Sequence, residues 1–118
     1  MSAVRPEFKL RMRITQGEQV AIGPGKIALL EALDQAGSIT AAAKALGMSY
    51  RRAWLLIDEL NHALREPAVT TAAGGAQGGG SVLTDSGRAL VALYRQIEAR
   101  AQAHCADDIR ALTGMLAD

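Results

Sequence analysis

The chain has 118 residues, 49% of them hydrophobic, and a formal net charge of +1. This length predicts one domain with at most a short extension, and no apolar run is long enough to cross a bilayer. The single cysteine, Cys105, excludes an internal disulfide and favours the cytoplasm, and the near-neutral charge means that any nucleic-acid contact must come from local clusters of basic residues.

Residues 8–22 predict an N-terminal β-hairpin. Apolar and basic side chains alternate in its first half: Phe8, Lys9, Leu10, Arg11, Met12, Arg13 and Ile14. This period of two is typical of a strand with one apolar and one basic face. Gln16-Gly17-Glu18 turns the chain, and Val20 to Ile22 returns as a second strand. The basic face is first of all a solvated face that protects a strand edge; contact with phosphate or a partner is the alternative.

A first helix follows the hairpin. Gly23-Pro24-Gly25 breaks the strand and starts the helix, and Gly37 ends it. Ile27, Leu30 and Leu33 form its apolar stripe. We expect this helix to pack across the back of the next two and to complete a three-helix core.

The stretch from Gly37 to Asn61 predicts a helix-turn-helix. Ser38 caps a short alanine-rich helix, Gly47 supplies the left-handed residue that ends it, and Ser49 caps a second helix. In that second helix the spacing of Ala53, Trp54, Ile57 and Leu60 predicts one buried face, with Trp54 in the core.

Such a pair of helices can present the N-terminal turn of the second helix to the DNA major groove. Arginine is well shaped for a guanine edge or a phosphate. The candidate DNA contacts in the two helices are Ser38, Thr40, Ser49, Tyr50, Arg51 and Arg52. An ordinary helical hairpin with a solvated arginine pair is the alternative interpretation.

A second hairpin is expected after Pro67, with strands at Val69 to Thr71 and Val82 to Thr84 around a glycine-rich loop. A hairpin directly after a recognition helix is typical of a wing, whose glycine N–H groups can face phosphates. The candidate DNA contacts in this loop are Gly74, Gly75, Gln77, Gly78 and Gly79. A plain linker between two strands is the alternative. The loop lacks the Gly-Lys-Ser/Thr ending of a nucleotide-binding loop.

The last segment predicts a long helix from Asp85 to Leu112, capped by Thr84, with a break or turn at Asp107-Asp108. Leu90, Tyr94, Ile97 and Ala101 form a narrow apolar seam. The seam could complete the monomer core, but its length favours a homodimer interface. We therefore divide the chain into a winged helix-turn-helix domain at residues 1–84 and a helical dimerisation extension at residues 85–118, a mainly α fold with small β elements.

At Gly37 to Leu64, and again at Gly74 to Tyr94, the chain resembles the N-terminal DNA-binding domain of ModE-type molybdate-responsive regulators, which is related to the LysR-type winged helix. The matching runs are GSITAAAKALGMSYRRAW, IDELN, GGAQGGGSVLT and GRALVALY. The resemblance covers most of the chain from Gly23 to about Ile97. It implies a bacterial transcriptional regulator that dimerises through the helix after the wing, with Ser49 to Arg52 at the start of the recognition helix.

Two departures limit what the resemblance implies. Members of the family carry oxyanion-binding domains after the long helix, whereas this sequence ends at Asp118, so molybdate binding is not expected. Basic residues that the family often has before and in the wing are replaced here by the uncharged Thr71 and Ala76.

No pattern predicts catalysis, a metal site or a cofactor. His104 and Cys105 are adjacent and point in different directions from a helix, and two histidines with one cysteine make no zinc spacing. The sequence therefore predicts a DNA-binding regulator that is not an enzyme and acts on double-stranded DNA. The alternative is a winged-helix module that docks a protein partner, for instance an accessory protein of molybdenum metabolism.

Overall fold

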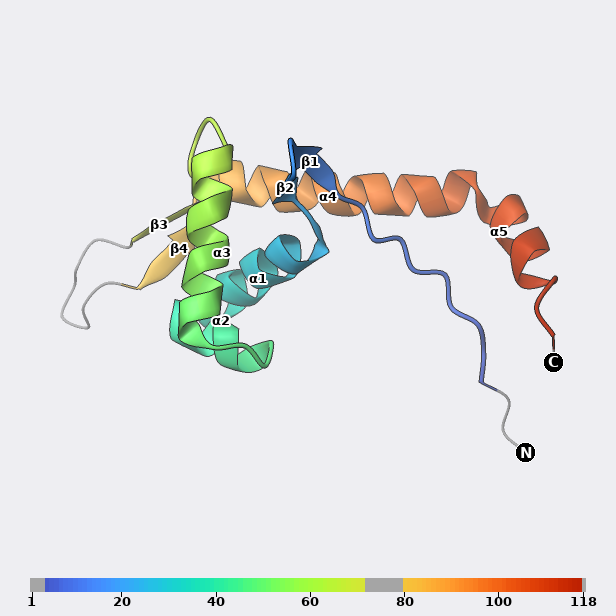
Figure 1. Cartoon of the computed structure of the whole chain (residues 1–118), viewed down its shortest axis with the longest axis horizontal. Helices are drawn as coiled ribbons and strands as arrows, with labels where there is room; N and C mark the ends of the chain where they lie inside the picture. Colours follow the sequence, from blue (N-terminus) through green and yellow to red (C-terminus); the bar gives the residue numbers. More distant parts are fainter. Residues whose placement is uncertain (1–3, 72–79, 118) are drawn as a thin grey trace.

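The structure, a computed structural model, describes residues 4–71 and 80–117. Its elements in chain order are β1 (Ile14–Gln16), β2 (Gln19–Ile22), α1 (Pro24–Ala36), α2 (Ile39–Ala45), α3 (Tyr50–Ala63), β3 (Val69–Thr71), β4 (Ser81–Leu83), α4 (Asp85–His104) and α5 (Ala106–Thr113). Both strand pairs, β1–β2 and β3–β4, are antiparallel. In Figure 1 the helices α1 to α3 gather beside the β3–β4 pair, and α4 runs past them towards α5. The predicted winged helix-turn-helix with an N-terminal hairpin is confirmed.

The helix ends lie where the capping residues predict them. Ser38, Ser49 and Thr84 each accept a hydrogen bond at 3.0–3.1 Å from the backbone N–H three residues further on. Gly37 and Gly47 have positive φ angles of 78° and 69°, a conformation that side chains with a Cβ adopt only at a cost. These local signals set the entry and exit of each helix of the helix-turn-helix.

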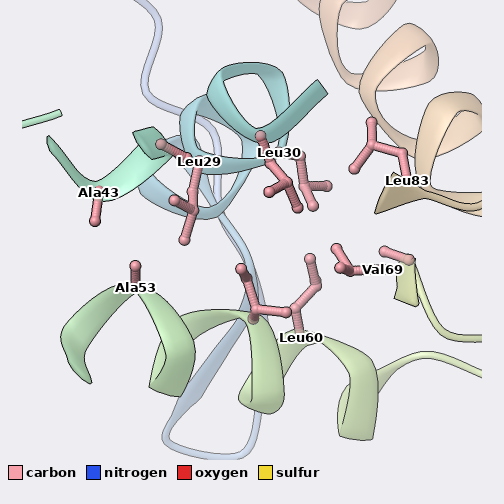
Figure 2. Packing of buried hydrophobic residues seen from close by; sticks show 11 residues of the cluster. Leu29, Leu30, Ala43, Ala53, Leu60, Val69 and Leu83 are labelled. Carbon is pink, nitrogen blue, oxygen red and sulfur yellow. The ribbon is translucent and has the colours of Figure 1, made fainter. Parts of the chain in front are cut away.

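The core joins the three helices to the wing strands (Figure 2). Its buried members are Leu29, Leu30, Leu33, Ala42, Ala43, Ala53, Ile57, Leu60, Ala68, Val69 and Leu83. Ala43 of α2 and Ala53 of α3 face each other in Figure 2, and because neither carries more than a methyl group, the two helices approach closely. Val69 and Leu83, partners in the strand register, close the other end of the core. The wing is therefore anchored on the same core as the recognition helix.

The N-terminal hairpin is shorter than predicted. The strand was expected from Phe8, but residues 8–13 form no strand, and β1 begins at Ile14. The return strand β2 has only four residues before Gly23, so it provides hydrogen-bonding partners for Ile14–Gln16 alone. Residues 8–13 alternate in the way a strand does, but β2 is too short to offer them hydrogen-bonding partners.

Trp54 was predicted to lie in the core, and this was wrong. Its side chain is 45% exposed, whereas Ala53, Ile57 and Leu60 are buried. Successive residues of a helix are turned by about 100° from one another, so Trp54 lies beside the stripe that Ala53 heads. Ala53 occupies the position that packs against α2, and Trp54 lies to one side of it, near the wing strands.

The long C-terminal helix breaks, as expected, but earlier than Asp107. α4 ends at His104, Cys105 has helix-breaking angles (φ −100°, ψ 13°), and α5 begins at Ala106. Asp107 and Asp108 then lie in the first turn of α5, where acidic side chains favour the positive end of the helix dipole. The two aspartates therefore mark the start of a new helix and follow the break.

Candidate nucleic-acid interface

The N-terminal turn of α3 presents an exposed polar and basic surface. Tyr50, Arg51 and Arg52 are all exposed, as is the capping residue Ser49. The turn before them is fixed because the Met48 N–H donates to a carbonyl of α2 at 3.0 Å. Among the described residues, no carboxylate pairs with Arg51 or Arg52, so this turn carries two exposed guanidinium groups at a helix start, as a major-groove reader does.

The candidate contacts on α2 differ from each other. Thr40 is exposed in the first turn of α2 and is available to a ligand. Ser38 is half-buried, and its Oγ already accepts from the Ala41 N–H at 3.1 Å. Ser38 therefore acts first as a helix cap, and only its hydroxyl hydrogen is free to donate.

The candidate wing contacts, Gly74, Gly75, Gln77, Gly78 and Gly79, lie outside the described residues, as does Ala76. The strands that carry the wing are described. Gly80 comes so close to α1 that an added Cβ would lie 2.8 Å from the Gly37 oxygen. Glycine at position 80 therefore lets β4, the return strand of the wing, start directly against the end of α1.

Asn61, which the sequence analysis did not single out, joins α3 to the wing. Its Oδ1 accepts from the N–H groups of Ala68 (2.8 Å) and Val69 (3.3 Å), and its Nδ2 donates to the Val69 oxygen at 3.1 Å. One side chain thus satisfies three backbone groups at the start of β3, the strand that opens the wing. An asparagine on the wing-facing side of a helix just before a proline-containing loop is the only sequence signal, and it is weak.

Lys26 performs a related role on the opposite side of α3. Its side chain is 8% exposed, and its Nζ donates to the Val20 oxygen at 2.6 Å and lies 3.5 Å from Glu59 Oε1. The lysine of α1 therefore ties the N-terminal hairpin to the recognition helix. A buried ammonium needs such partners, because an unpaired charge would be costly to remove from water.

The segment after the wing is fixed by close packing and polar contacts. The Thr84 Oγ1 donates to the Pro67 oxygen, and the Ser86 Oγ donates to Glu66 Oε2, both at 2.6 Å. Gly87 is buried at the start of α4, where an added Cβ would lie 2.2 Å from the Ala68 oxygen. The segment that follows β4 is therefore bonded to residues 66–68, which precede β3, so the two ends of the wing are held together.

Further along, α4 packs on α1 through an ion-pair cluster. Arg95 lies 2.5 Å from Glu31 Oε1 and 2.7 Å from Glu98 Oε1. The hydrogen bond from Arg95, partly offset by burial, lowers the pKa of Glu31, and the same contacts raise the pKa of Arg95. These groups are partly exposed, so the cluster orients α4 more than it stabilises the fold.

The predicted dimer seam is divided between the interior and the surface of one chain. Tyr94 is only 3% exposed, and its hydroxyl donates to the Met12 oxygen at 2.7 Å, while Leu90 packs against the core. Ile97 is 46% exposed, and Leu93, one turn before it, is 58% exposed. Tyr94 therefore serves the monomer fold, and the free apolar surface of α4 lies at Leu93 and Ile97. Ala101 is half-buried.

Within residues 4–71 and 80–117, no three His, Cys, Asp or Glu side chains gather in a way that could hold a metal ion. Over the same residues, no helix combines the length and apolar character that crossing a membrane requires. The features that the structure does bring together are those of a binding surface: an exposed basic helix start, flanked by two anchored hairpins.

A helix-turn-helix whose second helix exposes basic residues beside a β wing defines the class of DNA-binding transcriptional regulators. Residues 25–88 match the family described as "Bacterial regulatory helix-turn-helix protein, lysR family", and this span is more than half of the chain. The chain belongs to this family of bacterial regulators.

Several curated proteins are similar to the chain over this region. The "Molybdenum transport protein ModE" of Azotobacter vinelandii is 46% identical over 98 residues, 83% of this chain and 36% of that protein. The "Molybdenum-pterin-binding protein MopB" of Rhodobacter capsulatus is 47% identical over 66% of this chain and 29% of its own length. The "DNA-binding transcriptional dual regulator ModE" of Escherichia coli is 36% identical over 89% of this chain and 40% of its own length. The chain thus spans between 29% and 40% of the length of these three relatives, and its similarity to ModE-type proteins is confirmed.

Proposed function

We propose that this chain is a sequence-specific regulator that binds double-stranded DNA by inserting the N-terminal turn of α3 into the major groove. The observation that carries this is the exposed turn Tyr50, Arg51 and Arg52, held rigid by the Ser49 cap. Arginine can bond a guanine edge in bidentate fashion, which gives sequence preference as well as affinity. We expect the protein to act in the cytoplasm, where chromosomal DNA is accessible.

A selection from a random duplex library tests this function. The parent chain should enrich a defined site, and Arg51→Ala or Arg52→Ala should weaken binding to that site by about 1–3 kcal/mol wherever the arginine contacts a base. Arg65→Ala, which removes an exposed arginine beyond the C-terminal end of α3, is the matched control. Failure of the parent to enrich any sequence, or full binding by the double Arg51/Arg52 alanine variant, would contradict the proposal.

The competing function is a winged-helix module that docks a protein partner, as an accessory of molybdenum metabolism. The two functions respond differently to salt. Counterion release makes the affinity for DNA fall steeply with salt concentration, whereas an apolar protein interface is nearly indifferent. Because the names of two relatives refer to molybdenum transport or a molybdenum pterin, promoters of molybdenum genes are the first natural sequences to test.

We further propose that the chain acts as a homodimer through α4 and α5. The exposed apolar side chains Leu93 and Ile97 of α4, with Leu112 of α5, form the surface that a second copy would cover. A two-fold dimer would place two recognition helices about 34 Å apart, so the DNA site should be an inverted repeat. Ile97→Glu should then give a monomer in sedimentation velocity with weaker DNA binding. Ala99→Glu, the same charge on another exposed side of α4, should leave the dimer intact, and a monomeric parent would exclude the model.

Molybdate is not expected to bind to this chain. Arg11, Arg13 and Arg52 line an open groove in which solvent and salt screen their charge. A small oxyanion would have to be captured there without an enclosing set of donors. Calorimetry with sodium molybdate should show no stoichiometric heat, and saturable binding at micromolar concentration would contradict this expectation.

A further inference from the structure

The recognition helix α3 lies between two hairpins, of which only the wing has been assigned to DNA. In Figure 1 the β3–β4 pair lies on one side of α3 and the β1–β2 hairpin on the other. Asn61 bonds α3 to β3, and β2 contacts α3 on the opposite flank. If α3 enters a groove of a partner, the two hairpins therefore lie close to the two edges of that groove.

A groove of about 440 Å³ runs between the β1–β2 side and α3. The charged side chains that line it are Arg11, Arg13, Lys26, Arg52 and Glu59. Lys26 is already paired with Glu59, so the two charges largely cancel each other. The three arginines are exposed, and no described carboxylate lies within 4 Å of any of their guanidinium groups. The groove therefore carries a net local excess of positive charge although the whole chain is almost neutral.

Contacts on either side of Arg13 hold this part of the chain against the domain. Arg13 passes over the end of β2, where its Cγ would lie 3.6 Å from a Cβ added at Gly23. Tyr94 holds the preceding residue, Met12, through the 2.7 Å hydrogen bond to its oxygen. Lys26 fixes β2 to α3 through Val20 and Glu59. The basic segment that precedes β1 is thus held against the domain at both sides of Arg13.

From this placement we propose that Arg11 and Arg13 contact the phosphate backbone on the side of the major groove opposite to the wing. The inference rests on the proposed DNA-binding function. A major groove is about 12 Å wide and is bordered by two phosphate backbones, so a helix inserted in it has one backbone along each flank. Arg52 lies on the same flank of α3 as the groove and joins the base-reading turn to this phosphate clamp. Contacts of this kind fix the register of a protein on DNA without reading sequence.

Salt titration of DNA binding tests the assignment on the full chain. The probes are a labelled duplex carrying the site selected by the parent and a scrambled duplex of the same composition. Arg11→Ala and Arg13→Ala should each raise Kd about fivefold, the equivalent of about 1 kcal/mol for an exposed charge pair. Each should also lower the slope of log K against log salt by about 0.9, and equally for both duplexes. Arg13→Lys should restore most of the slope, because a phosphate requires charge more than a planar fork.

Controls separate the outcomes. Arg65→Ala should keep the parental slope, and thermal melts should show that every variant is folded. If the folded Arg11/Arg13 double alanine variant keeps the parental slope, the phosphate clamp is refuted while the function of α3 stands. If its weaker binding is accompanied by a change in sedimentation, the arginines serve association between copies and the clamp is likewise refuted. If the parent binds no duplex in a salt-dependent way, the proposed function itself fails.

Discussion

The hydrogen bonds of Asn61 make the strongest prediction about how the recognition helix and the wing act as one unit. Replacing Asn61 with Ala leaves the N–H groups of Ala68 and Val69 and the Val69 oxygen without their side-chain partner. Ala68 and Val69 are buried, so water reaches these groups poorly. At about 1 kcal/mol for each lost hydrogen bond, the free energy of unfolding should fall by about 3 kcal/mol. For a domain of this size that corresponds to a drop of roughly 10 °C in Tm.

Asn61→Asp is the matched variant, because it keeps the shape and both accepting contacts but loses the Nδ2 donor. It also places a carboxylate against the Val69 oxygen, so it should cost about 1–2 kcal/mol, less than Asn61→Ala. Urea unfolding followed by circular dichroism measures both losses. At temperatures where Asn61→Ala is fully folded, DNA affinity should still fall, because the wing is no longer held to α3. Parental stability of Asn61→Ala, or equal losses in the two variants, would refute the role of Asn61.

The remaining predictions concern packing and charge. Gly87→Ala should cost about 2–3 kcal/mol, because its Cβ would lie 2.2 Å from a backbone oxygen next to β3, whereas Gly25→Ala, with nothing within 4 Å, should be tolerated; urea midpoints compare them. Trp54→Ala should lower the free energy of unfolding by about 1–2 kcal/mol, less than the roughly 3–5 kcal/mol of a core tryptophan, since the side chain is nearly half exposed. A larger loss in thermal melts would mean that Trp54 is a core residue. Glu31→Gln should cost at most about 1 kcal/mol at neutral pH, because Arg95 and Glu31 are partly exposed. Since the pKa of Glu31 is lowered in the folded state, its contribution to stability is present above the unfolded-state pKa and is lost as pH falls through the folded-state pKa. The Tm values of the parent and of Glu31→Gln should therefore converge at acid pH.

Elements defined by local signals could be predicted from the sequence. Ser38, Ser49 and Thr84 cap helices, and Gly37 and Gly47 take positive φ, because each of these roles depends only on neighbouring residues. The wing strands were also predicted to within one residue, at Val69–Thr71 and Ser81–Leu83, since they border the glycine-rich loop. These signals are sufficient to identify the fold.

Features that depend on which neighbour packs where could not be predicted in this way. Trp54 is apolar and lies next to the buried stripe, so periodicity alone cannot show that Ala53 takes the close contact with α2 and displaces it. Tyr94 belongs to the apolar seam of α4, yet its hydroxyl donates to the Met12 oxygen, 82 residues away in sequence, and the ring is buried within one chain. In both cases a tertiary partner decides the position of a residue whose local pattern permits two.

The orientation of the proposed DNA-binding surface depends on two polar side chains that carry no periodic signal. Lys26 fixes the N-terminal hairpin to one flank of α3 through Val20 and Glu59, and Asn61 fixes the wing to the other. Apolar packing holds the helices together, but it is not directional, whereas hydrogen bonds to backbone groups set the position of each hairpin along α3. The basic segment before β1, the start of α3 and the wing strands β3 and β4 are therefore held in fixed positions relative to one another. A change at either side chain should weaken binding to every duplex, while the preference among sequences, which we propose is set at Arg51 and Arg52, should be preserved.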